Sequence, residues 1–250
     1  MMVPNSADTG DRTREARSGP PISADALATR LGDIARELQN EEDTDSVLAG
    51  IVHAALELVP HTDDASVSLV TGRRTIDSRA ASSDLPRRVD DLQIETGQGP
   101  CLDASYEERI VNVPDLSVDQ RWPDFSRGAY KLGAKSMLSF QLFVDGSHLG
   151  ALNLFGHQVG AFDAESERIG ALVAAHAAVA VAGSQQVSQL TTALDTRDLI
   201  GQAKGILMER YKITAQQAFL LLSRASSELN IKLHDVAERL TVTGEMAKKR

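Results

Sequence analysis

The chain has 250 residues, and its 26 basic and 35 acidic side chains give a net charge of −9. This length allows two modest domains with separate cores. A single cysteine excludes a framework of internal disulfides, and the polar N-terminal segment lacks the apolar core of a signal peptide. The apolar segment 171–182 is too short to span a bilayer. We therefore expect a soluble cytoplasmic protein with no membrane partner.

The N-terminal part is expected to hold a disordered arm followed by two helices. Residues 1–23 are rich in Asp, Arg, Ser, Gly and Pro, a composition typical of disorder. Apolar residues then recur at helical spacing over 25–38 and again over 46–58, and Pro60 ends the second helix.

The middle of the chain predicts two pairs of strands, the first joined by a turn at Gly72 and the second at Asp145-Gly146. The predicted strands are 65–70, 75–80, 136–144 and 148–156. A long helical pattern begins near Asp163. Helices first, strands in the middle and a closing helix make an α+β domain.

Three blocks of sequence within 24–183 carry a family resemblance. They are Thr96-Gly-Gln-Gly-Pro-Cys-Leu102, Ile110-Val-Asn-Val-Pro-Asp115 and Leu149-Gly-Ala-Leu-Asn-Leu-Phe155. On these blocks the segment resembles a GAF domain, a sensory fold that often binds small ligands. The resemblance implies an antiparallel sheet with flanking helices and a small-molecule ligand whose identity is unknown, and no cofactor is identified.

The first of these blocks contains residues that invite chemistry. The glycines at 97 and 99 lack the Lys-Ser/Thr pair of a phosphate-binding P-loop, so a tight turn explains them more simply. Cys101 has two interpretations: a thiolate favoured by a helix start, which would sense redox conditions, or a small buried packing residue.

Other candidate sites in this domain are weak. The six histidines show no metal-ligand spacing, so no metal site is expected, and neither His148 nor His157 demands a haem. Leu154 stands where the Asn-Lys signature of cyclic-nucleotide-binding relatives would place lysine, which argues against such a ligand. The acidic pairs Asp63-Asp64 and Asp90-Asp91 are interpreted as solvated loop charges, so no catalytic residue and no enzyme is expected.

From residue 163 to residue 211 the chain has no proline, and apolar or small residues recur in steps of three and four. These positions are Ile169, Leu172, His176, Val179, Gly183, Val187, Leu190 and Leu194. The pattern is typical of a coiled-coil seam and predicts a parallel homodimer, with 184–198 as a helical linker. The alternative is one amphipathic helix that caps the core of each domain.

The helix predicted over 199–211 contains two interior glycines, Gly201 and Gly205, each of which costs about 1 kcal/mol relative to alanine. Either the helix frays or kinks here, or the missing side chains admit another molecule beside Lys204 and Arg210. A capping box at Thr214 starts a second helix, and Asn230 separates it from a third that stops at Gly244. The apolar positions of these two helices are Ala218, Leu221, Leu222, Ala225, Leu229, Leu233, Val236, Ala237 and Leu240.

Several spaced blocks in this region agree in order with one family: Ile200-Gly-Gln-Ala-Lys-Gly-Ile-Leu-Met208, Thr214 with Ala218-Phe219, Arg224-Ala225, and 230–237. The region 199–246, followed by a basic tail at 247–250, resembles an ANTAR domain, the RNA-binding output module of bacterial transcription antiterminators. A sensor followed by this module is a known arrangement in actinobacterial regulators. The fold class expected is thus an α+β sensor joined by a long helix to an all-α three-helix domain.

The distribution of charge is consistent with this resemblance. Residues 186–250 hold 10 Lys and Arg against 7 Asp and Glu, a net charge of +3, so the remainder carries −12. The resemblance implies that the C-terminal module binds RNA stem-loops in leader transcripts and prevents terminator formation, with the sensor in control through a ligand or its dimer state. The candidate RNA-binding residues are Arg197, Gln202, Lys204, Arg210, Tyr211, Arg224 and Lys232. Phe219 either stacks on a base or, as we favour, lies in the core.

The competing hypothesis is a DNA-binding transcriptional regulator with a sensing domain, since a small trihelical bundle can imitate a helix-turn-helix. No predicted helix presents the row of Arg, Asn and Gln expected for reading the major groove. The RNA interpretation is therefore favoured, and the DNA-binding regulator remains the alternative.

Overall fold

The computed structural model describes residues 23–41, 43–71, 75–100, 109–144 and 147–246. It divides into two compact units, Met1–Ala182 and Gly183–Arg250. Cys101, the turn residues Gly72, Asp145 and Gly146, the arm up to residue 22 and the basic tail lie outside the described residues.

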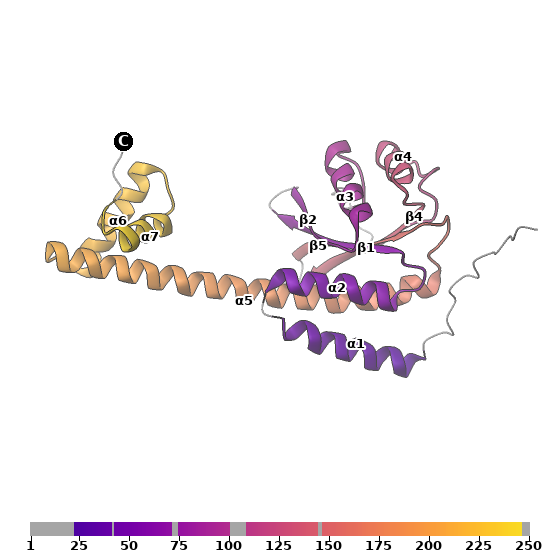
Figure 1. Cartoon of the computed structure of the whole chain (residues 1–250), viewed down its shortest axis with the longest axis horizontal. Helices are drawn as coiled ribbons and strands as arrows, with labels where there is room; N and C mark the ends of the chain where they lie inside the picture. The colour runs from indigo at the N-terminus through magenta and orange to yellow at the C-terminus, as the bar shows by residue number, and fades with distance from the viewer. Residues whose placement is uncertain (1–22, 42, 72–74, 101–108, 145–146, 247–250) are drawn as a thin grey trace, which may run out of the picture. The chain divides into compact units, whose positions relative to one another are not determined.

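The first unit contains a five-stranded antiparallel sheet in the order β2-β1-β5-β4-β3 (Figure 1). Its strands are β1 (Asp64–Thr71), β2 (Thr75–Ala81), β3 (Ile110–Val113), β4 (Ser136–Val144) and β5 (Ser147–Gly156). Its helices are α1 (Ala24–Gln39), α2 (Thr44–Leu58), α3 (Asp84–Thr96), α4 (Pro123–Leu132) and the first part of α5 (Ala164–Tyr211).

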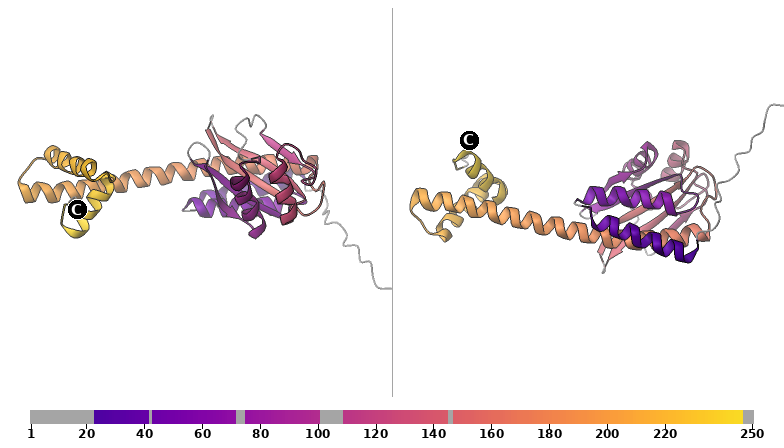
Figure 2. Two further views of the ribbon diagram at one scale, coloured as in Figure 1. Left: turned by 90° about the horizontal axis from the view of Figure 1, so that it is seen from above. Right: turned by 60° about the horizontal axis from the view of Figure 1, so that its bottom comes forward.

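Alternation along the strands gives the sheet two different faces. On β1, Ala65, Val67 and Leu69 lie in the large apolar core with α1, α2 and the first part of α5. Ser66 and Ser68, one position out of phase, are buried on the opposite face. Figures 1 and 2 show α3 and α4 covering this second face. The second face is therefore the polar side of the sheet, with a smaller apolar core beneath α3 and α4.

The predicted α+β architecture is confirmed, including both antiparallel strand pairs, β1 with β2 and β4 with β5. Both N-terminal helices start at side-chain caps, where Ser23 accepts from the backbone of Ala26 and Asp43 accepts from that of Ser46. Helices α3 and α4 and strand β3 were not predicted from the sequence. Helix α3 buries the polar residues Asp90 and Gln93 as well as Pro86 and Val89, so its buried side is not apolar throughout.

The second unit holds the C-terminal part of α5 together with α6 (Ala215–Leu229) and α7 (Leu233–Thr243). The predicted capping box is confirmed: Thr214 Oγ1 accepts from the Gln217 backbone, and the Gln217 side chain returns to the Thr214 backbone. Asn230 and Gly244 end α6 and α7 in the left-handed conformation. The core residues are Ala203, Leu207, Ala218, Leu222, Ala225, Val236, Ala237 and Leu240.

Within the described part of the chain, α5 holds the one stretch that is long and apolar enough to cross a membrane, with a mean hydropathy of 1.2. Its apolar side chains have another use in the fold. Val173, Ala177 and Val181 are buried in the core of the first unit. The stretch is 39% buried, so its apolar residues belong in part to the core of the first unit.

Candidate functional site

The core of the second unit determines which side of α5 is exposed. Ala203 and Leu207 point into the core against α6 and α7, and both are fully buried. Gly201 and Gly205 lie off this buried line and are exposed. The helix continues through both glycines to Tyr211, so α5 is not broken at either position.

Neither glycine is explained by packing inside the protein. A Cβ added at Gly201 or Gly205 would meet no atom within 4 Å. Gly170 in the same helix differs, because a Cβ there would overlap the Phe140 ring. An exposed glycine in a helix lowers stability by about 1 kcal/mol relative to alanine. The two C-terminal glycines therefore leave bare backbone facing outward at a cost to the helix.

An open groove of about 790 Å³ lies beside Gly205, between α5 and α7. Five of its lining residues are on one side of α5, and the sixth, Thr241, belongs to α7. The lining residues are Gln202, Gly205, Ile206, Glu209, Arg210 and Thr241. The groove thus brings together two predicted binding residues, Gln202 and Arg210, with one of the two glycines.

The other predicted residues do not line this groove. Lys204 is partly buried on α5, while Arg197 and Tyr211 are exposed on the same helix. Arg224 is exposed on α6, and Lys232 is the exposed residue that precedes α7. The sequence analysis had no means of finding Thr241, because only the packing of α7 on α5 brings it to the groove.

Basic residues of both units form ion pairs with acidic side chains. In the first unit Arg30 pairs with Glu57, Arg79 with Asp45 and Arg121 with Asp119. In the second, Lys212 pairs with Glu209. None of the predicted basic residues there forms an ion pair with a described side chain; they are Arg197, Lys204, Arg210, Arg224 and Lys232. Their charges are therefore available to an outside anion.

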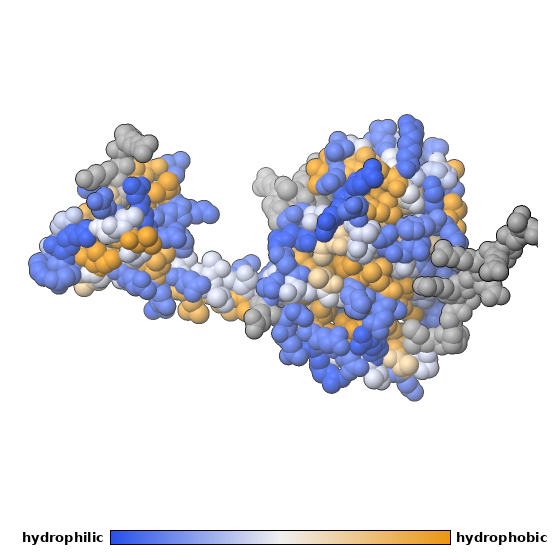
Figure 3. All heavy atoms as spheres, viewed as in Figure 1, coloured by the Kyte–Doolittle hydropathy of each residue, from blue (hydrophilic) through white to orange (hydrophobic). Residues whose placement is uncertain are grey.

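Helix α6 exposes three consecutive apolar side chains, Phe219, Leu220 and Leu221. Figure 3 shows that apolar residues form part of the surface of this unit. Phe219 is 42% exposed and Leu220 is 60% exposed. The expectation that Phe219 belongs to the core is therefore wrong. Ala218 and Leu222 define the inward face, and Phe219 is rotated about 100° away from Ala218. The exposed ring is available for stacking.

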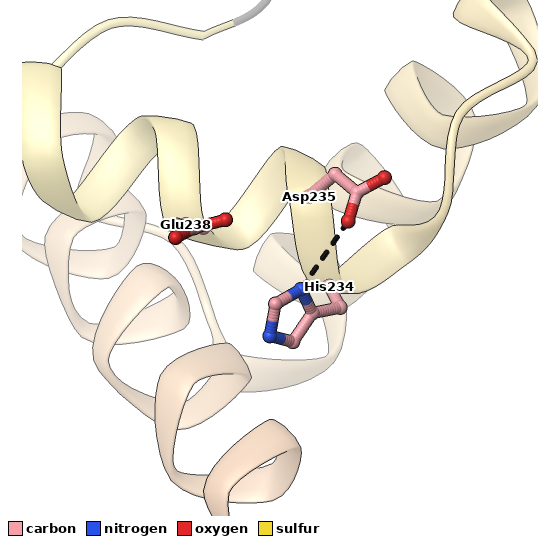
Figure 4. Close-up of side chains that lie close together, drawn as sticks. All are labelled: His234, Asp235 and Glu238. Carbon is pink, nitrogen blue, oxygen red and sulfur yellow. Dashed lines mark hydrogen bonds and ion pairs between the residues drawn. The ribbon is translucent and has the colours of Figure 1, made fainter. Parts of the chain in front are cut away.

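Three side chains of α7 lie close enough to hold a metal ion: His234, Asp235 and Glu238 (Figure 4). The His234 Nδ1 atom lies 3.3 Å from an oxygen of Asp235. This mixed group was not predicted from the sequence, because it contains one histidine and two carboxylates and not a pair of histidines. Asp235 and Glu238 are exposed, and all three residues come from one helix, so the group has the character of a solvated surface.

In the first unit, Asp90 of α3 is completely buried on the polar face of the sheet. Its carboxylate accepts hydrogen bonds from the hydroxyls of Ser68 at 3.0 Å and Ser78 at 2.7 Å, and from the Asn153 amide at 3.4 Å. Burial raises its pKa to about 6, against the opposing effect of the Ser78, Ser66 and Ser68 hydroxyls. The interpretation of Asp90 as a solvated loop charge is wrong.

Asp64 is also buried, contrary to the expectation of a solvated charge. It accepts hydrogen bonds from Ser82 and Ser83, and its second oxygen lies 3.0 Å from His157 Nε2. These contacts tie the start of β1 to the segment before α3 and to the end of β5. Asp64 therefore has a structural role that the sequence did not reveal.

The glycine-rich block at 97–99 forms the expected tight turn. Gly97 ends α3 in the left-handed conformation, and the Gln98 side chain pairs with the start of α4. Gln98 Oε1 accepts from the Asp124 backbone at 2.9 Å, while its amide donates to the Asp124 carboxylate at 3.1 Å. The turn thus joins two helices. Both interpretations of Cys101 concern a residue outside the described part of the chain.

Two family models match the chain. The model of the GAF domain matches residues 41–182, which is more than half of the chain. The model of the ANTAR domain matches residues 188–240. No match was found among curated proteins.

Solved structures resemble the chain at low sequence identity. The GAF domain of a phosphoenolpyruvate-protein phosphotransferase from Coxiella burnetii is 19% identical, with a TM-score of 0.53 over 65% of this chain and 96% of that one. The corresponding Acinetobacter domain is 20% identical, with a TM-score of 0.50 over 66% and 97%. A phytochrome photosensory core module from Stigmatella aurantiaca is 11% identical, with a TM-score of 0.53 over 82% and 45%. These likenesses show the fold alone.

Proposed function

The chain belongs to the GAF domain family and carries an ANTAR domain behind it, and on this architecture we propose that it regulates transcription antitermination by binding RNA. ANTAR is an RNA-binding antitermination module, and GAF is a sensory domain. Both are regulatory domains, so the chain is proposed to be a regulator without catalytic activity. The soluble character of both domains supports a cytoplasmic location.

The observation that carries the proposal is the exposed side of α5 around Gly205. It combines bare helix backbone, a groove, and basic side chains that have no ion-pair partner among the described residues. RNA loops offer unstacked bases and phosphates, which such a surface fits. The proposed contacts are Arg197, Gln202, Lys204, Arg210, Tyr211, Arg224 and Lys232.

The proposed mechanism is competition between two RNA structures. Binding of paired stem-loops in a leader transcript would hold the antiterminator form, and the terminator hairpin that shares its sequence would then not fold. Polymerase would read through into the downstream genes. Two adjacent stem-loops need two binding modules, so this mechanism calls for a dimer.

Exposed apolar side chains on α5 support that dimer. Val187, Leu190 and Leu194 are each about 60% exposed and follow one another in steps of three and four. An exposed apolar stripe with this spacing is typical of a coiled-coil seam. We assign the stripe to a parallel contact with a second copy of the chain, through which a ligand of the sensor would control RNA binding.

The proposal is tested first by crosslinking the tagged protein to RNA in its host and sequencing what is bound. Enrichment of tandem stem-loops just upstream of terminators would support it. In vitro, the same RNA and a duplex DNA of equal length are compared at one salt concentration. Stronger binding of the duplex would favour the competing DNA-binding hypothesis. The variant Lys204→Ala removes one of the proposed RNA contacts. Its control is Lys131→Ala, which changes an exposed lysine of α4.

A further inference from the structure

The groove between α5 and α7 has a mixed lining that distinguishes it from the rest of the exposed helix. Ile206 supplies apolar surface, Gln202 an amide and Thr241 a hydroxyl. Glu209 and Arg210 add a carboxylate and a guanidinium on the same side of α5. The groove can therefore offer both donors and acceptors next to an apolar surface.

Gly205 is central to this lining. Of the other groove residues of α5, Ile206 follows Gly205 directly, and Gln202, Glu209 and Arg210 lie three to five positions away on the same side of the helix. Because Gly205 has no side chain, the groove reaches the helix backbone at this point. Gly201 is equally exposed but does not line the groove. The bare backbone at Gly205 therefore faces the groove, whereas that at Gly201 does not.

The charges in the groove decide what fits it. A phosphate would be repelled by the Glu209 carboxylate, one oxygen of which is engaged by Lys212. The edge of a nucleobase carries donors as well as acceptors, so it can pair with a carboxylate, an amide and a guanidinium together. The flat face of a base can also lie on Ile206 beside the bare backbone. The lining is thus complementary to a base and not to a phosphate.

On the basis of the proposed function, we propose that this groove holds one unstacked base of the bound RNA loop. Gln202, Glu209 and Arg210 would contact the edge of that base. The remaining basic residues, among them Lys204 and Arg224, would contact the phosphates around it. The groove would then supply sequence specificity, and the phosphate contacts would supply the general affinity.

The test uses the full-length protein and a library of stem-loop RNAs with a randomised loop, selected on the wild-type chain. The affinity of the selected RNA is then measured for Gly205→Ala and for the matched variant Gly201→Ala. Both alanines gain helix propensity, and neither Cβ meets an atom within 4 Å, so thermal unfolding should show both variants folded. We expect Gly205→Ala to lower the affinity at least about tenfold and Gly201→Ala to change it less than about twofold.

A second measurement connects the groove to one base. Each loop nucleotide of the selected RNA is replaced in turn by an abasic one. At one position the abasic nucleotide should weaken binding to the wild-type chain about tenfold. The same replacement should add little to the loss of affinity that Gly205→Ala already causes. Equal affinities for the two alanine variants, or losses that simply add at every position, would overturn the assignment of the groove. Failure of the wild-type chain to enrich any loop would instead overturn the proposed function itself, and the groove with it.

Discussion

The Asp90 carboxylate of α3 is held by the Ser78 hydroxyl of β2 at 2.7 Å, in a site with no described cation as an ion-pair partner. The network continues through Asn153, whose carbonyl oxygen accepts from Ser139 at 2.8 Å. It therefore links α3 to strands β2, β1, β5 and β4. All its other members are neutral, so only their hydrogen bonds offset the effect of burial on the carboxylate.

The first prediction concerns the pH dependence of this network. The pKa of Asp90 is raised from 3.8 to about 6 in the folded state, so the folded chain binds more protons than the unfolded chain between these values. Stability from this group is thus full below about pH 4 and is lost as the pH rises through 6. Asp90→Asn should remove this dependence and stabilise the first unit at pH 7.5 by up to about 3 kcal/mol.

Chemical unfolding at pH 5 and pH 7.5 measures this effect. Asp91→Asn is the matched control, because Asp91 is the exposed neighbour on the same helix. The control should keep the pH dependence of the wild-type chain. Identical pH dependence in wild-type and Asp90→Asn proteins would show that Asp90 does not titrate in this range.

The second prediction concerns the basic residues of the RNA-binding module. Lys204→Ala should weaken RNA binding while leaving the fold intact, since Lys204 makes no ion pair with a described side chain. If it contacts a phosphate, the slope of log affinity against log salt should fall by about 0.7 to 1. Titrations at several salt concentrations measure the slope, and an unchanged affinity would remove Lys204 from the site.

The third prediction concerns the exposed stripe on α5. Leu190→Asp combined with Leu194→Asp should abolish the dimer, because each introduced charge would be buried without a partner in the seam. The helical content should remain, since both leucines are exposed within the single chain. Light scattering gives the mass. A wild-type mass that stays monomeric at every concentration would contradict the dimer.

The fourth prediction compares two glycines of the same helix. Gly170→Ala should destabilise the first unit by about 1–3 kcal/mol, because the added Cβ would overlap the buried Phe140 ring. Gly201→Ala should stabilise α5 by up to about 1 kcal/mol, because its Cβ meets open space. Thermal unfolding of the two variants measures both effects, and destabilisation by Gly201→Ala would reveal an unrecognised contact.

Most of the fold was predictable from local signals. Apolar periodicity predicted α1, α2 and α5, alternation predicted the two strand pairs, and Thr214 with Gln217 predicted the start of α6. Helix α3 was missed because it buries Asp90 and Gln93 along with Val89. A pattern of apolar residues alone does not show that Asp90 lies on the buried side of this helix, where serines of β1 and β2 donate to it.

The candidate site was predictable only in part. Gln202, Gly205 and Arg210 stand on one helix, so helical spacing alone brings them near one another. Thr241 joins them through the packing of α7, which no local pattern encodes. Phe219 was placed in the core because its neighbours are apolar, but the alanine before it takes the inward position.

A carboxylate held by hydroxyls and an amide has no Coulombic partner for dissolved ions to screen. Added salt should therefore leave the Asp90 network nearly unchanged, while it weakens phosphate contacts made by the second unit. A change of pH between 4 and 6 should instead change the stability that the Asp90 network contributes. An effect of acid on RNA binding at fixed salt that Asp90→Asn abolishes would therefore identify a signal that starts in the sensor.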